Sequence, residues 1–462
     1  MAIKKKKGGA VAGSDNEKLS VALDIGSSTL RIIAGHVTED LQIKVKGYLE
    51  CPSSGVFKGS ISDINKLASS IAYLIREFQS KFGITVNHVI TGVPGVYICA
   101  ENQTGTATVQ NSTVSIADRN RAIRNALAGI TKIHTSEYSI IHSTPQSYMT
   151  ELSRNISNPV GQYARRIEVI THIIGCKNFY KLNIEHVINK TSSDISASTL
   201  IYDGNAASAS VLTEAEKEIG VITIDIGSGT TSVTVFEGKK QLVSFGVDDG
   251  GDYITLLIAK AYSISMSEAE ILKVRCGYAS RYLMSEEEST FNTTMRVDAG
   301  SDKEFDLEIN YGELADVINT ALNSIFEYLI VKIYSEVSLI TEHISIGGGF
   351  VLTGGGSKLY GIDKVLQNTL AKYRDNPSYS IVTINDKVRL GHPKGITLSE
   401  DSGISSQMIN DSDKAVVTGL LRSARLEDRK QYTIDDAERD APKGRFGSIV
   451  KGFKKWVDDE IL

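Results

Sequence analysis

Two short polar segments in opposite halves of the chain place an aspartate, glycine and several hydroxyl groups directly after an apolar run. They are Asp24-Ile25-Gly26-Ser27-Ser28-Thr29 and Asp225-Ile226-Gly227-Ser228-Gly229-Thr230. Glycine lets a backbone approach a bulky anion, and the N–H groups and hydroxyls of such a turn can bind phosphate oxygens. The aspartate would repel phosphate, but it can reach it through hydrated Mg²⁺, which keeps most of its waters. Two such segments facing each other would hold a triphosphate between two domains.

Each of these polar segments is predicted to form the turn of a β-hairpin. Apolar runs at 19–25 and 30–35 flank the first segment, and runs at 221–226 and 232–236 flank the second. A single copy is typical of an ordinary β-turn. Two copies at corresponding places indicate an internal repeat, with two related domains that each open with the same hairpin.

A third glycine-rich segment follows a predicted strand and precedes a predicted helix at 359–370. Its residues are Thr353, Gly354, Gly355, Gly356 and Ser357. Glycines at this place would let a nucleoside lie flat against the backbone. A plain strand-to-helix turn has the same composition, and that alternative stays open for this segment taken alone.

Length and composition narrow the class of protein. A chain of 462 residues exceeds the size of one hydrophobic core, so two large domains are expected. The net charge of -5 argues against nucleic acid as the main partner. The four cysteines, Cys51, Cys99, Cys176 and Cys276, are far apart and predict reduced thiols in a cytosolic protein. The sequence has no run of about 18 apolar residues, so no membrane-spanning segment is predicted.

The two hairpins and the third glycine-rich segment resemble the phosphate 1, phosphate 2 and adenosine motifs of the actin superfamily. That superfamily includes actin, sugar kinases, DnaK-type chaperones, MreB and FtsA. The resemblance implies an α/β fold in which two RNase H-like domains flank a cleft that holds ATP and Mg²⁺. It implies metal contacts through water from Asp24 and Asp225, although Asp225 could also be a bare helix N-cap.

Further segments resemble the FtsA family in particular. They are Gly55-Val56-Phe57-Lys58-Gly59 with Asp63, Thr144-Pro145-Gln146-Ser147-Tyr148 with Asn158-Pro159-Val160-Gly161, the stretch 206–216, and Gly250-Gly251-Asp252 with 267–273. By the family pattern Gly251, Glu270 and Lys273 join the nucleotide site. Glu270 and Lys273 could instead be a surface ion pair between helix positions i and i+3.

The resemblance also divides the chain. It places a short α+β insertion, the family's subdomain 1C, at 94–171, inside a first domain (1A) made of 19–93 and 172–204. The second domain (2A) is expected at 205–242 and 316–425, with a subdomain 2B at 243–315. A disordered tail at 1–18, a flexible linker at 426–442 and an amphipathic helix at 443–462 complete the division.

One residue departs from the family pattern. Thr29 stands where FtsA sequences usually have lysine, and Arg31 lies two residues further on. A cation near the phosphates is therefore missing or supplied by Arg31. We expect ATP hydrolysis, if present, to be slow, and the sequence assigns no catalytic residue.

The C-terminal segment has the composition of a helix that lies in a membrane interface. Its apolar residues fall on one stripe, and cationic residues lie off it. The residues expected to meet anionic lipid are Phe446, Ile449, Val450, Phe453, Lys454, Lys455 and Trp456. A terminal helix docked on its own domain is the alternative. The run from Lys4 to Lys7 is typical of a disordered tail, and the alternative is a further contact with anionic lipid.

The resemblance implies a function. An ATP-binding cell-division protein would polymerise head to tail on the cytoplasmic membrane at the division site. It would bind the C-terminal tail of FtsZ through the 2B region and other divisome proteins through 1C. A pilus-type actin-like scaffold and an ATP-dependent kinase of the superfamily are the alternatives. Neither is expected to have the terminal amphipathic helix, so this helix argues against both. A DnaK-type chaperone would need a longer C-terminal domain.

Overall fold

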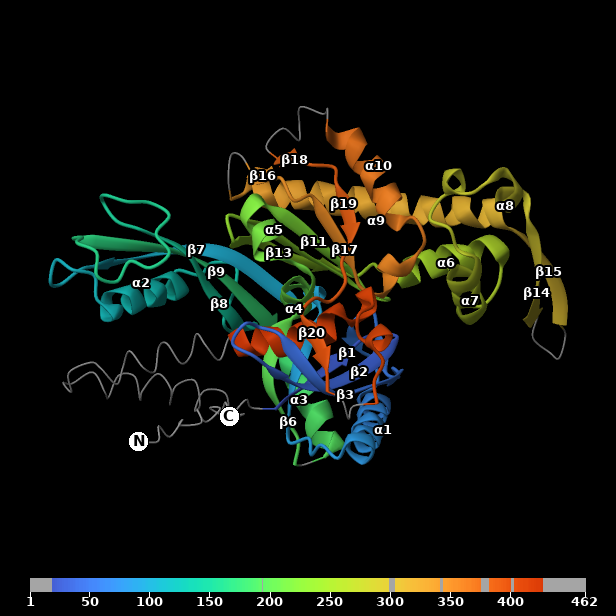
Figure 1. Cartoon of the computed structure of the whole chain (residues 1–462), viewed down its shortest axis with the longest axis horizontal. Coiled ribbons are helices and arrows are strands. Elements are labelled where there is room, and N and C mark those ends of the chain that lie inside the picture. The colour runs from blue at the N-terminus through green and yellow to red at the C-terminus, as the bar shows by residue number, and fades with distance from the viewer. Residues whose placement is uncertain are drawn as a thin grey trace, which may run out of the picture.

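The computed structural model of the chain describes residues 19–192, 194–298, 304–340, 344–374, 382–399 and 403–426 (Figure 1). The predictions of an N-terminal tail at 1–18, of the linker beyond 426 and of the terminal helix at 443–462 fall outside these residues.

The first of two large sheets contains the first and the last strand of the described chain. Its strands are β1 (Ser20–Ile25), β2 (Thr29–Val37), β3 (Ile43–Pro52), β6 (His88–Val93), β10 (Ser196–Tyr202) and β20 (Ile396–Leu398). Their order is β10-β6-β1-β2-β3-β20, in which β1, β2 and β3 form an antiparallel meander and β6 and β10 run parallel to β1. The predicted hairpin around the first polar segment is confirmed.

The second large sheet repeats this arrangement. Its strands are β11 (Val221–Ile226), β12 (Thr231–Glu237), β13 (Lys240–Val247), β17 (Phe350–Thr353) and β19 (Val388–Leu390). The order β19-β17-β11-β12-β13 matches β10-β6-β1-β2-β3, with the same meander and the same parallel neighbours. The internal repeat predicted from the two hairpins therefore extends to five strands in each domain.

Helices cover both faces of the first sheet. On one face α1 (Ile64–Phe82) and α3 (Asn178–Thr191) pack against alternate strand residues such as Leu23 and Ile32. Helix α1 begins at Asp63, whose carboxylate accepts the N–H groups of two residues of the first turn, and it ends at Gly83, which has φ of 65°. Asp63 is therefore a helix cap, which explains its place in the predicted family motif.

The second sheet packs against α9 (Tyr311–Ser338) and α10 (Ile362–Arg374), while α4 (Asp203–Val211) and α5 (Glu214–Ile219) lead from the first sheet to the second. Among the described helices, α9 alone is long and apolar enough to cross a membrane. Its apolar side, including Leu314, Ile318 and Phe326, is buried in the core of the second domain. This packing explains its composition.

The last part of the described chain belongs to the first domain, which corrects the expected second domain of 316–425. Strand β20 pairs with β3, and the helix at 415–426 buries Val417, Leu420 and Leu421 against the second face of the first sheet. The apolar face of this helix was visible in the sequence. The sheet that it covers was not, because chain order alone does not show a return to the first domain.

The insertion is a three-stranded sheet with one helix. Strands β7 (Ile98–Thr108), β8 (Tyr138–Met149) and β9 (Arg166–Lys177) lie in the order β7-β9-β8, and α2 (Ile116–Ala128) packs against them. The sequence predicts this helix with the same bounds, from Ile116 to Ala128. Strand β8 was missed, because its alternation is broken by polar residues and by bulges at Ile141 and Gln146. The expected end at 171 falls inside β9, which continues to Lys177.

A second peripheral unit projects from the second domain on the opposite side of the molecule from the insertion (Figure 1). It contains α6 (Gly251–Tyr262), α7 (Met266–Cys276), α8 (Glu286–Thr290) and the hairpin of β14 (Asn292–Asp298) and β15 (Glu304–Asn310). The expected start of this unit at 243 falls inside β13, which is a strand of the second sheet.

A single methyl group should test how closely the helix at 415–426 packs on α4. A Cβ atom at Gly419 would lie 1.8 Å from the carbonyl oxygen of Ala206, so Gly419→Ala must push the two helices apart. We expect the free energy of unfolding to fall by about 3 kcal/mol, measured by urea denaturation. The control is Gly129→Ala, where the nearest atoms lie 3.5 Å away and little change is expected. Equal stability of both variants would contradict this packing.

Candidate nucleotide site

A cavity of about 780 Å³ lies between the two sheets, at the turns of the two duplicated hairpins. Its volume falls in the range of small-molecule sites. All but one of the nucleotide-site residues predicted from the sequence line it. They are Asp24, Gly26, Ser27, Ser28, Thr29, Asp225, Gly227, Ser228, Gly229, Thr230, Gly251, Glu270, Lys273, Gly354, Gly355 and Gly356.

The two hairpin turns have the same internal geometry. The Gly26 N–H donates to the Thr29 carbonyl (3.2 Å), and the Gly227 N–H donates to the Thr230 carbonyl (2.9 Å). This bond holds each turn tight, and the hydroxyl residues that follow each glycine line the cavity. The cavity therefore receives two similar sets of backbone and hydroxyl groups, one from each domain.

Aspartates Asp24 and Asp225 occupy matching places one residue before the ends of β1 and β11. Both side chains are buried. Burial raises the pKa of both carboxyls, and burial together with the nearby Asp24 raises that of Asp225 to about 7. Since Asp225 lies within a strand, its alternative interpretation as a helix N-cap is wrong.

The third glycine-rich segment forms a close turn against the second hairpin. Gly354 has φ of 84°, and a Cβ atom there would lie 2.4 Å from Asp225 Oδ1. A Cβ atom at Gly356 would lie 2.5 Å from the Ile226 side chain. Only glycine fits at these places, so the backbone itself forms this wall of the cavity.

Ser357 differs from the prediction because it does not line the cavity. Its hydroxyl is buried, donates to the Gly354 carbonyl (2.7 Å) and lies 3.0 Å from the Ser412 hydroxyl. Ser357 therefore stabilises the glycine turn from the side that does not line the cavity. A serine after three glycines gives no sign in the sequence of which side it faces.

The residues Glu270 and Lys273 form the ion pair that was offered as the alternative to a role in the site, with 2.6 Å between Lys273 Nζ and Glu270 Oε2. The same ammonium group donates to the Gly251 carbonyl (3.0 Å) and to the Thr255 hydroxyl (2.8 Å). Both side chains also line the cavity. The pair thus ties α7 to the start of α6 at the cavity wall.

Arg31 lines the cavity but already has three carboxylate partners. Its guanidinium lies 3.4 Å from Asp24, 3.2 Å from Glu50 and 3.2 Å from Asp413. Lys414 completes the cluster, with its ammonium 2.8 Å from both Glu50 and Asp413. Burial raises the pKa of Glu50, but hydrogen bonds from Lys414 and Tyr48 lower it more. The cation expected in place of the family lysine is therefore present and paired.

Asp203 also lies in the site, although its sequence context does not predict this. This residue begins α4 directly after β10, and its carboxyl lines the cavity. Its Oδ1 atom is buried and has no hydrogen-bond partner among the described residues. Burial, with Asp24 and Asp225 nearby, raises the pKa of Asp203 well above its ordinary value. A lone aspartate after a short strand carries no motif, so only the fold could bring it into the site.

A loop of the first domain lies beside the cavity, next to the two hairpin turns. The Gly59 N–H donates to the Ser27 hydroxyl (2.9 Å), and a Cβ atom at Gly229 would lie 2.7 Å from the Cα atom of Lys58. Lys58 also pairs with Asp249 of the second domain (3.3 Å). The loop is therefore held between the two hairpins.

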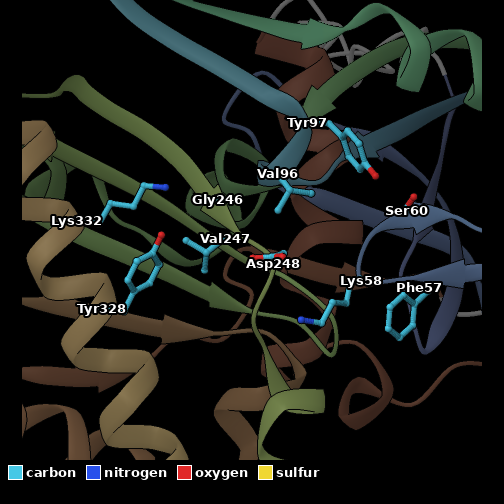
Figure 2. Close-up of a pocket in the computed structure, with 10 residues that line it drawn as sticks. All are labelled: Phe57, Lys58, Ser60, Val96, Tyr97, Gly246, Val247, Asp248, Tyr328 and Lys332. Atoms are coloured by element: carbon cyan, nitrogen blue, oxygen red, sulfur yellow. The ribbon is translucent and has the colours of Figure 1, made fainter. Parts of the chain in front are cut away.

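A second cavity, of about 480 Å³, lies on the other side of this loop (Figure 2). Figure 2 shows side chains reaching it from three parts of the chain, namely the loop with Lys58, the start of the insertion with Tyr97, and α9 with Tyr328 and Lys332. The end of β13 completes its lining. The space thus lies where both domains and the insertion meet.

Comparison with solved structures places the fold in a known class. A chain of a "PilM-PilN type IV pilus biogenesis complex" superposes with a TM-score of 0.57 at 17% sequence identity, over 87% of this chain and 97% of that chain. The duplicated sheets, the paired hairpins and the cleft between them define an actin-like protein with an inserted small domain.

Sequence comparison identifies the family. The family model described as "Cell division protein FtsA" matches residues 222–418, and that of the "SHS2 domain inserted in FTSA" matches 95–175. The chain is 28% identical to Cell division protein FtsA of Buchnera aphidicola subsp. Schizaphis graminum (strain Sg), over 97% of this chain and 99% of the relative. It is 26% identical to that of Escherichia coli (strain K12), over 96% and 99%. The chain belongs to the FtsA family of cell division proteins.

The carboxylate cluster around Arg31 gives a prediction for stability. Arg31→Ala leaves Asp24, Glu50 and Asp413 without their shared cation, and we expect the free energy of unfolding to fall by about 3 kcal/mol at pH 7. The loss should shrink as the pH falls toward 4, because the Asp24 carboxylate, which loses its ion pair with Arg31, then takes up a proton. Urea denaturation at several pH values measures both effects.

The matched control is Arg76→Ala on the exposed side of α1, where the guanidinium lies over the Tyr73 ring at 5.9 Å. We expect a change of about 0.5 kcal/mol there, at any pH. A loss for Arg31→Ala as small as this, or one independent of pH, would contradict the role of the cluster.

Proposed function

We propose that the cavity between the two sheets binds ATP. The observation that carries this proposal is the convergence of two duplicated hairpins and one glycine turn, far apart in the sequence, on a single cavity. The two hairpin turns supply N–H and hydroxyl groups for phosphates. The wall of Gly354, Gly355 and Gly356 offers bare backbone to a nucleoside, with Glu270 and Lys273 beside it.

We also propose that Mg²⁺ accompanies the nucleotide and is held through water by Asp24 and Asp225. Two buried carboxylates of raised pKa on opposite walls suit a divalent cation, which favours their charged forms. Among the described residues, no group of three or more His, Cys, Asp or Glu side chains is placed to hold a metal directly. When bound, Mg²⁺ would neutralise phosphate charge. Asp203, which lines the cavity, would accept a hydrogen bond from an attacking water through its carboxyl.

Filling the cavity without disturbing the fold tests the proposal. A Cβ atom at Gly355 meets only the Asp413 Cβ, at 3.8 Å, so Gly355→Val should fold normally. Its side chain takes space at the nucleoside wall, and we expect affinity for a fluorescent ATP analogue with Mg²⁺ to fall by at least about tenfold. Gly129→Ala, on the remote helix α2, should bind like the wild type. Equal affinity of Gly355→Val and wild type would remove this cavity as the ATP site.

A second arm of the same experiment concerns hydrolysis. Asp203→Asn should still bind the analogue but release phosphate about 100-fold more slowly, because the amide cannot take up a proton from water. Phosphate release that is as fast in this variant as in the wild type would assign the role to another group.

We further propose that the protein polymerises head to tail on the cytoplasmic membrane at the division site, tethers FtsZ filaments there and helps recruit later divisome proteins. Membership of the FtsA family supports this cell-division role. The 2B region, offered as the site for the C-terminal tail of FtsZ, exposes Met266, Ile271 and Val274 on α7. The insertion, offered to other divisome proteins, exposes Leu152 and Tyr163 near its far end.

The membrane part of the proposal rests on the apolar stripe and lysines of residues 443–462. We expect the full chain to sediment with anionic liposomes and a chain ending at Ala441 to stay in solution, with ATP present or absent. Phe453→Asp with Trp456→Asp in the full chain is the matched control, since it keeps the length and removes the apolar stripe. If both lengths of chain stay in solution at low salt, the helix is a docked core element.

A further inference from the structure

The insertion is attached to the molecule in two different ways. The chain enters it from β6 and leaves it into α3, so both covalent connections join it to the first domain. It also packs against β13, the edge strand of the second sheet. The insertion therefore touches both domains that flank the nucleotide cavity.

Side chains of the insertion satisfy backbone groups of the β13 edge. The Asn102 amide donates to the Leu242 carbonyl (2.8 Å), and the Gln241 N–H donates to the Gln146 side-chain oxygen (2.7 Å). In a sheet these backbone groups would pair with another strand. We call this contact the bridge. It gives a structural reason for the Pro-Gln-x-Tyr motif, because Gln146 lies at a bulge between Pro145 and Ser147 and its side chain accepts from β13.

A buried histidine forms the centre of the bridge. His172 Nδ1 lies 2.8 Å from Asn102 Oδ1, and its Nε2 lies 2.9 Å from the Ser244 hydroxyl, which also accepts from the Gln241 amide (2.7 Å). The neutral ring thus donates to Asn102 and accepts from Ser244. Burial, with His142 nearby, lowers the pKa of His172 to about 3, so the ring stays uncharged near neutral pH. A dry, fully paired network of this kind is costly to break.

Tyr202 connects the bridge to the nucleotide cavity. Its N–H donates to His142 Nε2 of the insertion (3.1 Å), and its hydroxyl reaches the second sheet, donating to the Phe245 carbonyl (2.6 Å). The next residue is Asp203, which lines the cavity. One short segment thus contacts the insertion, the edge strand β13 and the site.

The junction has both a tight contact and free space. A Cβ atom at Gly95 would lie 2.6 Å from the Cα atom of Gly246, so the root of the insertion touches the second sheet backbone to backbone. Beside this contact lies the cavity of Figure 2, lined by Val96, Tyr97 and Val247. A rotation about the glycine contact would have room on this side.

We propose that the insertion follows the second domain, so that ATP binding between the sheets reorients it, and that a partner bound to the insertion changes ATP affinity in return. The inference rests on the proposed ATP site. Any rotation of the second sheet against the first must either carry the insertion with it or break the buried bridge. The reciprocal effect on ATP follows from thermodynamic linkage.

Hydrogen exchange of the full chain, with and without ATP and Mg²⁺, tests the proposal. In the wild type, ATP should change amide exchange in β7, β8 and β13. The double variant Asn102→Ala with Gln146→Ala should bind ATP with an affinity changed by about fivefold or more. It should lose most of the ATP-dependent difference in β7 and β8. Tyr202→Phe, which removes only the hydroxyl contact with the second sheet, should weaken the difference.

The matched control is Asn125→Ala, whose amide donates to the Thr106 carbonyl within the insertion (2.7 Å). It should keep the ATP-dependent difference, which separates loss of the bridge from loosening of the insertion itself. ATP bound with no change in β7 or β8 overturns the inference alone, as does a double variant that responds like the wild type. Failure of the wild type to bind ATP overturns the proposed function with it.

Discussion

The burial of three carboxyl groups around one cavity is the constraint on which this structure depends. Asp24, Asp203 and Asp225 come from different strand ends, and each has a raised pKa because it is removed from water. Of these three carboxyls, only Asp24 forms an ion pair with Arg31. The same guanidinium also pairs with Glu50 and Asp413. Carboxylates that are buried without enough cations favour protonation or a bound cation. The fold thus keeps a group of buried carboxyls whose negative charge Mg²⁺, bound with a nucleotide, would offset.

Because the two domains repeat one arrangement of strands, the buried carboxyls lie between two separate sheets. The five strands of each domain follow one order, so each hairpin turn lies at the same end of its own sheet. Facing copies of the turn then form opposite walls of one cavity. A ligand that contacts both walls is sensitive to the distance between the sheets, which a site inside one domain would not be.

The structural features that could be predicted from the sequence are those with a repeated motif or a regular spacing of apolar residues. Both hairpins, α2 and the glycine turn were found because their signals are local, and nearly all the predicted site residues line one cavity. Features that depend on distant contacts were missed or misplaced. Asp203 carries no motif, Ser357 faces away from the cavity, and the helix at 415–426 returns to the first sheet. Strand β8 was missed because Gln146 and its neighbours serve a contact across domains, at the expense of a regular alternation.

The way in which the insertion meets β13 also bears on how the molecule can move. A strand added to that edge would fix the two parts through a continuous ladder of backbone bonds. Here Asn102 and Gln146 reach the edge through side chains, and His172 fills the space behind them. Side chains can tilt with the edge strand, whereas a ladder cannot change its register without breaking several bonds. The arrangement protects an exposed edge and still lets the insertion follow the second domain relative to the first.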